Sequence, residues 1–386
     1  MRRWLLFGLL LGALWLALTW GLHRALSRGA ILGADFWTVW LGARATFVEG
    51  LDPYGPQVTQ RSQQGIYGRP ARPDEDQVRF AYPLFAVVPL MPWAWLPYDW
   101  AYAAWLAFHL MALLGLARWA FPRLPWWMAL SLLLFFPVWR DLWLGQYSLW
   151  IMENTWLLWG WWQRRRGRVG VGWGTGLAFL LSKPQEGLLW ILMGVWAAVR
   201  QARKKALVGL ILGAALLMAL PNLWVPRWPW ALLTQVWRYW RDNPVPNVAS
   251  RFADRMGSPL AFVLLVGLIL GLWVWTAWRW VQGRVRCTTW LALTAWSITL
   301  LHPQTSTTGQ TAYVLPLWAW MSTPTFGRRL WVWLVALVLP WVLFFVFFQG
   351  YEPLWVAWGT LGAFGLWTLG LMVYDLRHSP LSEEPS

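Results

Sequence analysis

The stretch "MRRWLLFGLLLGALWLALTWGL" (residues 1–22) places an uncharged apolar run directly after two arginines. A helix needs about 20 consecutive apolar residues to cross the hydrocarbon core of a bilayer. This run is too long for the apolar core of a signal peptide, and it lacks a small-residue cleavage site. We therefore interpret residues 4–22 as a retained membrane span.

Similar apolar runs recur to the end of the chain. Hydrophobic residues make up 58% of the sequence and charged residues 12%, with a mean hydropathy of +0.41, whereas a soluble domain has about 25% charged residues. The runs are 4–22, 82–118, 125–139, 147–162, 169–182, 186–199, 206–224, 259–278, 287–301, 311–321, 330–348 and 353–374. They predict an all-α polytopic transmembrane bundle of about 11–13 spans, with residues 1–378 as one integral membrane domain.

The run at 82–118 is too long for one simple helix. Pro89, Pro92 and Pro97 lie in its first half, and proline removes a backbone donor and breaks a helix interior. We expect a re-entrant or broken piece there, followed by the span proper.

Short basic links determine the predicted orientation. They are "QRRRGR" (163–168), "RQARKK" (200–205), "RWVQGRVR" (279–286) and "GRR" (327–329). The positive-inside rule places these links in the cytoplasm, together with the N-terminus and the polar tail 379–386. Arg24 and Arg28 favour the opposite orientation of the first span.

The longer loops then share the extracytoplasmic face of the cell membrane. They are 23–81, 140–148, 182–186, 225–258 and 302–311, and most of the carboxylates fall in or beside them. We expect the functional site on that face. The net charge of +16 does not indicate a nucleic acid partner, because the basic residues lie between apolar runs, where they set topology and contact membrane lipids.

Asp35 begins the first outer loop. Apolar residues recur at near-helical spacing from Phe36 to Phe47, which predicts an amphipathic helix on the membrane surface with Asp35 as its N-cap. "EGLDPYGP" (49–56) ends that helix in turns, the expected role of Asp52. The residues alone leave open whether Asp35 is only a cap or also a general base.

Several later polar residues have two possible roles each. Arg79 suits a phosphate or lipid headgroups. Glu153, inside an apolar run, marks a functional site or bonds to a neighbouring helix. Lys183, followed by a helix-breaking proline, suits an anionic ligand or pairs with Glu186.

Two further segments carry candidates. "RDLWLGQYSLW" (140–150) offers a possible pair of Arg140 with Asp141, and Gln146 as both donor and acceptor. His302 opens "HPQTSTTGQT" (302–311), a run of hydroxyl and amide groups suited to phosphate or sugar, or simply to solvent. The four histidines have no metal-ligand spacing, and no Gly-rich phosphate loop occurs. We therefore expect no metal and no cofactor.

The order of these motifs resembles the GT-C class of membrane glycosyltransferases, and most closely glycosyltransferase family 87, the polyprenyl-phosphate-mannose-dependent alpha-mannosyltransferase-like group. The matching residues are Asp35, Gly50, Asp52, Pro53, Tyr54, Phe80, Tyr82, Pro83, Gly145, Gln146, Lys183 and Pro184. The resemblance covers about residues 1–200. It departs at Leu84, where the family has a second proline, and in the late loop "HPQTSTTGQTAY" (302–313).

The resemblance implies a hexosyltransferase with a GT-C fold. Its donor would be a polyprenyl-phosphate sugar, with mannose as the sugar by family analogy, and its acceptor would be a lipid or glycan. Asp35 would act as the general base of an inverting transfer. The donor's phosphate and sugar would be bound by Arg79, Tyr82, Arg140, Gln146, Lys183, His302 and Gln304.

Other functions stay open at this point. A transporter or flippase of lipid-linked sugars would share the span pattern, although such proteins carry internal repeats and none is evident. An assembly factor for envelope polysaccharides would tolerate Asp35→Asn. A ligase that joins glycans to lipid would differ only in its donor.

Overall fold

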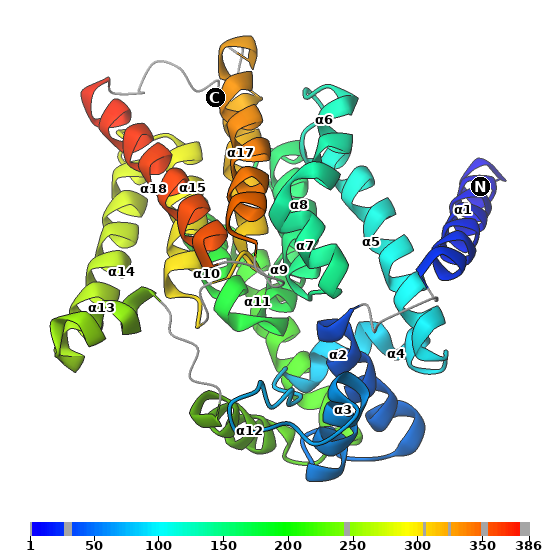
Figure 1. Cartoon of the computed structure of the whole chain (residues 1–386). Coiled ribbons are helices and arrows are strands. Elements are labelled where there is room, and N and C mark those ends of the chain that lie inside the picture. The colour runs from blue at the N-terminus through cyan, green and yellow to red at the C-terminus, as the bar shows by residue number, and fades with distance from the viewer. Residues whose placement is uncertain are drawn as a thin grey trace.

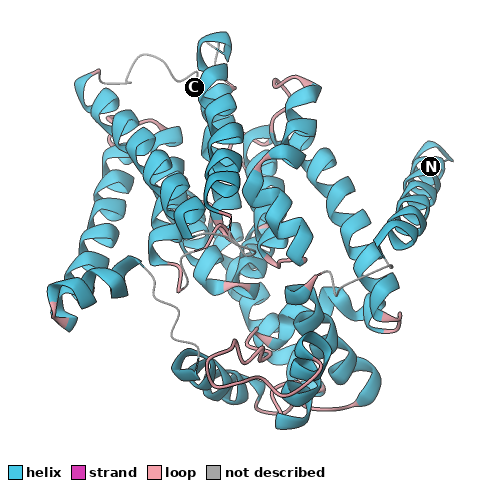
Figure 2. Ribbon diagram, viewed as in Figure 1, coloured by secondary structure: helices cyan, strands magenta, loops and turns pink. Residues whose placement is uncertain are grey.

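The computed structural model describes residues 2–26, 33–242, 248–303, 306–322, 326–348 and 354–378. These residues form helices joined by loops, and no strand occurs among them, as Figure 1 and Figure 2 show. The predicted all-α class is confirmed. The tail 379–386 lies outside the described residues.

The longer helices form the bundle. They are α1 (Arg2–Leu26), α5 (Tyr98–Ala120), α8 (Ser148–Arg164), α10 (Pro184–Arg200), α11 (Lys204–Ala219), α14 (Pro259–Val281), α15 (Cys287–Leu301), α17 (Phe326–Phe347) and α18 (Leu354–Arg377). The other α-helices are α2 (Ala34–Arg44), α3 (Pro56–Tyr67), α4 (Met91–Ala94), α6 (Trp126–Ser131), α7 (Phe136–Leu144), α9 (Val171–Phe179), α12 (Trp228–Asp242), α13 (Val248–Met256) and α16 (Val314–Met321). Shorter turns are the π-helix η1 (Ala45–Glu49) and the 3₁₀ helices η2 (Leu84–Leu90), η3 (Leu132–Leu134), η4 (Leu180–Ser182), η5 (Leu220–Leu223) and η6 (Gln310–Tyr313).

Six described helices are long and apolar enough to cross a membrane, in α1, α5, α11, α14, α17 and α18, or seven if the pair α6–η3 and α7, bent by 62°, counts as one span. The chain is thus a multi-pass membrane protein. The number is below the predicted 11–13 because several apolar runs form shorter helices. For example, α8 and α10 have 17 residues each and α15 has 15. Large apolar side chains on α1, α14 and α17 point outward, as a lipid-facing surface requires.

The predicted break in 82–118 is confirmed. The chain forms the 3₁₀ helix η2 and the single turn α4 before it enters α5 at Tyr98. Pro83 precedes η2, and Pro97 caps α5. Each proline lacks a backbone N–H, so the polypeptide restarts its helix at these points.

The loop helices α2, α3, α4 and α12 gather at one end of the bundle, which we call the loop end (Figure 1). α2 does not lie on a surface as predicted. Phe36 and the residues from Thr38 to Ala43 are buried, because α2 is covered by α3, α4, η2 and α7. The amphipathic pattern therefore reflects packing inside the protein rather than contact with lipid.

Candidate functional site

The start of α2 fixes the position of Asp35. Gly33 is the N-cap, with φ +76°, and no side chain caps the helix, so the predicted cap role of Asp35 is wrong. A Cβ atom at Gly33 would lie 2.4 Å from the ring of Tyr102. Only glycine adopts this left-handed conformation so close to a neighbouring ring. Asp35 is thereby free to point its carboxylate elsewhere.

The Asp35 carboxylate meets the turn that follows α7. Gln146 Nε2 donates a hydrogen bond to Asp35 Oδ2 over 2.6 Å. Gly145 forms the turn with φ +66°, and a Cβ atom there would lie 2.5 Å from Cβ of Phe36. The turn is closed by a hydrogen bond from Gln146 N to the carbonyl of Asp141, 2.8 Å. The glycine lets the turn approach α2 and present Gln146 to Asp35.

Lys183 joins this amide to a second acidic group. Its Nζ lies 3.2 Å from Oε1 of Gln146, 2.6 Å from Oγ of Ser148 and 2.6 Å from Oε1 of Glu186. Lys183 sits between η4 and α10, where Pro184 starts the new helix. It is buried, with 4% of its surface exposed. Of the two roles left open for Lys183, the structure shows the pairing with Glu186, and a bonded chain runs from Asp35 through Gln146 and Lys183 to Glu186.

Glu186 is surrounded by donors from three segments. Ser148 Oγ donates to its Oε1 over 2.8 Å, and His302 Nε2 lies 3.4 Å from the same oxygen. A Cβ atom on Gly309 would lie 3.2 Å from that oxygen, so the late loop also approaches closely. His302 thus joins the cluster. Gln304 lies outside the described residues.

The electrostatics of the cluster suit a carboxylate base. Burial raises the pKa of Asp35, and the charges of Lys183 and Arg140, with the hydrogen bond from Gln146, oppose that rise. A carboxylate that has lost water is more basic than one in solution, while a nearby cation keeps its ionised form accessible. Because the charge of Arg140 acts on Asp35, this predicted site residue lies near the cluster.

Tyr82 also belongs to this neighbourhood. Burial raises the pKa of its phenol, and the negative charges of Asp35 and Glu186 add to the rise. Its ring centroid lies 5.8 Å from that of Tyr147. Tyr54 donates its hydroxyl to the Tyr82 carbonyl over 2.8 Å, while Asp52 accepts from the Tyr54 backbone N–H over 2.9 Å. The predicted turn role of Asp52 is confirmed.

Arg79 is paired away from this cluster. Its Nη2 lies 2.6 Å from Oδ2 of Asp242 at the end of α12. Sequence reasoning could not anticipate this partner, because 163 residues separate the two side chains in the chain.

Sequence reasoning named Asp141 only as a partner for Arg140 and gave it no place in the site. It is 0% exposed, and neither carboxylate oxygen has a hydrogen-bond partner among the described residues. The predicted pair with Arg140 is electrostatic only: no hydrogen bond joins the two side chains, but the charge of Arg140 acts on the Asp141 carboxylate. Asp141 interacts electrostatically with Asp35, Lys183 and Glu186. The only sequence signal was its position four residues before Gly145.

Glu153 has the second of its two predicted roles. His109 Nδ1 lies 2.8 Å from Glu153 Oε1, and both side chains are buried between α5 and α8.

The described residues hold no group of three or more His, Cys, Asp or Glu side chains arranged to bind a metal ion.

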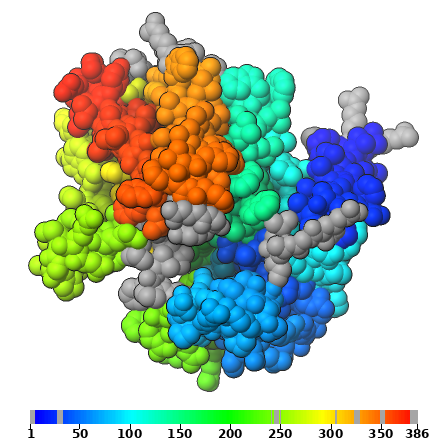
Figure 3. Space-filling model, in the orientation of Figure 1, coloured from blue at the N-terminus to red at the C-terminus, as the bar shows by residue number. Residues whose placement is uncertain are grey.

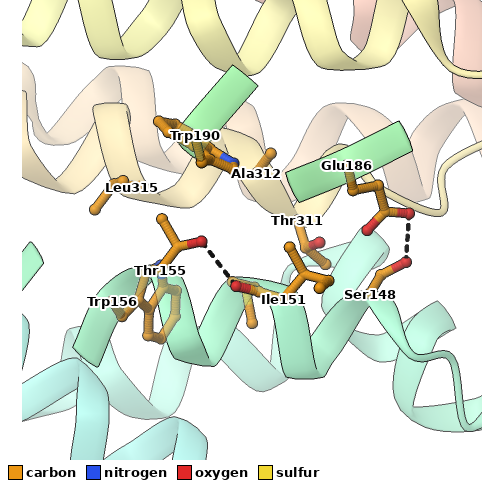
Figure 4. Close-up of a pocket in the computed structure, with 11 residues that line it drawn as sticks. Ser148, Ile151, Thr155, Trp156, Glu186, Trp190, Thr311, Ala312 and Leu315 are labelled. Carbon is orange, nitrogen blue, oxygen red and sulfur yellow. Dashed lines mark hydrogen bonds between the residues drawn. The ribbon is translucent and has the colours of Figure 1, made fainter. Parts of the chain in front are cut away.

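A narrow cavity opens beside Glu186 and Ser148. Figure 4 shows these two side chains facing each other near one end of it, with Trp156, Trp190 and Leu315 towards the other. Thr155, Trp190 and Leu315 also line a second cavity, of about 80 Å³. That cavity is apolar and lies between α8, α9, α10 and α15. The two cavities therefore lie side by side and share part of one wall.

Comparisons with known proteins identify a family for this chain. A model of glycosyltransferase family 87 matches residues 80–303, more than half of the 386 residues. The matched segment contains Gln146, Lys183, Glu186 and His302, and Asp35 precedes it. No curated protein and no solved structure matches the chain.

Proposed function

This chain belongs to glycosyltransferase family 87, and we propose that it transfers a hexose, mannose by family resemblance, from a polyprenyl-phosphate sugar to a lipid or glycan acceptor. We place the reaction at the extracytoplasmic face of the cell membrane. The observation that carries the proposal is the chain of contacts Asp35–Gln146–Lys183. It sets a basic carboxylate and a buried cation on opposite sides of one amide.

These residues fit the chemistry of inverting transfer. An acceptor hydroxyl attacks the anomeric carbon, and Asp35 takes the hydroxyl proton. The bond between that carbon and the phosphate oxygen breaks, and the lipid phosphate leaves with the electron pair. A positioned base contributes about 10²–10⁴ in rate. Lys183 stabilises the charge on the leaving phosphate.

The remaining cluster residues take supporting roles in this proposal. Arg140 and His302 add cationic character or donors near the leaving phosphate. Gln146 orients the base, and Tyr82 packs beside the sugar. Gln304 joins them by its place in the sequence alone.

The cavities support a lipid-linked donor. A polyprenyl phosphate needs an anion site joined to an apolar channel. The cavity beside Glu186 and Ser148 shares lining residues with the larger apolar cavity, and Lys183 contacts both Glu186 and Ser148. The phosphate would lie at Lys183 and the prenyl chain would extend between α8 and α10.

The test uses the full chain in lipid nanodiscs with radiolabelled polyprenyl-phosphate mannose and a lipid extract of the host as acceptor. We expect transfer by the unmodified protein and a loss of about 10²–10⁴ in Asp35→Asn, with donor binding retained. Asp254→Asn, an exposed carboxylate on α13, serves as the matched control. Equal transfer by Asp35→Asn and the unmodified protein would remove Asp35 from the mechanism. Donor movement across the membrane without transfer would favour a transporter.

A further inference from the structure

A separate cavity of about 270 Å³ lies at the loop end, between α3 and α12. Figure 3 shows the surface of α3 and the segment after it beside the green surface of α12. The side chains that line the cavity are mostly polar, among them Tyr54, Thr59, Gln60, Arg79, Gln235 and Arg238. Its lining contrasts with the apolar cavities inside the bundle, and the mechanism above does not use it.

A hydrogen bond and an ion pair hold the wall of this cavity in place. Gln235 is 2% exposed, and its Nε2 lies 3.4 Å from Oγ1 of Thr59. Arg79 is fixed by Asp242, yet its Nε is buried and has no hydrogen-bond partner among the described residues. Arg238 also lines the cavity and is exposed, so this wall offers a charged hydrogen-bond donor to a ligand.

The cavity adjoins the reaction centre. Tyr54 lines it and donates its hydroxyl to the backbone of Tyr82. Tyr82 in turn lies close enough to Asp35 for the carboxylate to affect its pKa. Tyr54 and Tyr82 therefore connect the wall of this cavity to the surroundings of Asp35.

We propose that this cavity binds the acceptor, and that the acceptor carries a hydroxyl-rich headgroup with a phosphate. Glutamine amides donate and accept hydrogen bonds, which suits sugar hydroxyls. The Tyr54 ring offers an apolar face for a sugar ring. The Arg238 guanidinium suits phosphate oxygens. That the ligand is the acceptor of the reaction rests on the proposed function. The chemical class of the ligand rests on the cavity alone.

The test measures binding without donor, so that it is independent of transfer. The full chain in nanodiscs is titrated with mannose 6-phosphate and with mannose, and binding is followed by saturation-transfer NMR. We expect the phosphorylated sugar to bind more tightly. Gln235→Leu and Arg238→Gln should each weaken its binding about tenfold, as the loss of one hydrogen bond to a charged group predicts.

Matched controls come from the same end of the protein. Gln57→Ala changes an exposed glutamine on α3, and Arg255→Gln an exposed arginine on α13; neither lines the cavity, and both should bind as the unmodified protein does. Arg238→Lys should retain most of the affinity, and thermal unfolding of each variant checks its fold. Equal binding of the two sugars, or equal loss in controls and cavity variants, would overturn the proposal.

A competition arm identifies the source of the headgroup. Displacement of mannose 6-phosphate by the host lipid extract supports a phosphorylated glycolipid, and persistence of the bound sugar phosphate supports a soluble anionic glycan. If the cavity binds as expected but Asp35→Asn transfers normally, the catalytic proposal fails and the binding site stands.

Discussion

At the scale of single residues, the site depends on how one carboxylate is held. Asp35 has lost much of its water, and its pKa is raised by burial while Lys183 opposes the rise. A general base works in its ionised form. Activity must therefore fall as the pH drops through the pKa of Asp35.

The first prediction concerns this pH dependence. We expect the acidic limb of kcat/KM for sugar transfer to lie above 3.8, the ordinary pKa of an aspartate. Lys183→Met removes the main cation that opposes the rise, so the limb should move to higher pH. Lys205→Met, at an exposed lysine of a basic link, should leave it in place. A limb that stays unchanged or moves to lower pH in Lys183→Met would contradict this account of the electrostatics.

The second prediction concerns Asp141. Its two oxygens are buried without hydrogen bonds in the described part of the chain, which costs stability unless a ligand pairs with them. Asp141→Asn removes the charge at constant size. We expect no decrease in the thermal unfolding temperature and a loss of transfer of at least about tenfold. A destabilised variant with full activity would show that Asp141 serves the fold alone.

The residue scale also shows what the sequence could predict. The pair Lys183–Glu186 was foreseeable because the residues are three apart at a helix start. The N-cap of α2 could not be foreseen from the sequence. Gly33 adopts its conformation against Tyr102, which lies 69 positions later in the chain. The ion pair between Arg79 and Asp242 could not be foreseen either, because these residues are also far apart in the sequence.

At the scale of elements, broken helices create the site. α7 ends in the Gly145 turn, η4 ends at Lys183, and α15 ends before His302. Backbone groups outside regular helices need hydrogen-bond partners, which lipid does not offer. Here the protein itself surrounds these groups. The prolines and glycines that mark these breaks are visible in the sequence. Their convergence on Asp35 and Glu186 is a property of packing.

The third prediction tests one such break. Gly145→Ala places a Cβ atom 2.5 Å from Cβ of Phe36 at φ +66°, a conformation that costs an ordinary residue roughly 1–2 kcal/mol. The turn must shift, and Gln146 moves away from Asp35. A displacement of about 1 Å lowers rates about 10²-fold, so transfer should fall by that order while donor binding changes less. Initial rates and donor binding in nanodiscs provide the measurement.

Gly115→Ala is the control for that variant. Gly115 lies inside α5, and a Cβ atom there meets nothing within 4 Å, so alanine should preserve both activity and stability. Full activity in Gly145→Ala would show that the approach of the turn to α2 is not required.

At the scale of the whole molecule, the two ends of the bundle differ: one carries the polar loops and the other the basic links. The loops predicted to share one face do meet, since contacts join Asp35 to Gln146, Glu186 to His302 and Arg79 to Asp242. The alternation of basic links and polar loops was enough to predict this grouping. The number of full spans was not, because helix length depends on where each chain segment breaks.

The last prediction tests the orientation of the whole chain. In a Cys287→Ala background, which removes the single cysteine, Asp74→Cys introduces a thiol at the loop end and Arg166→Cys one in a basic link. Both native residues are exposed. The positive-inside rule places the link in the cytoplasm. A membrane-impermeant maleimide should therefore label Asp74→Cys in intact cells, and Arg166→Cys only after permeabilisation. The reverse pattern would move the loop end, with Asp35, to the cytoplasmic face and would rule out an extracytoplasmic transfer reaction.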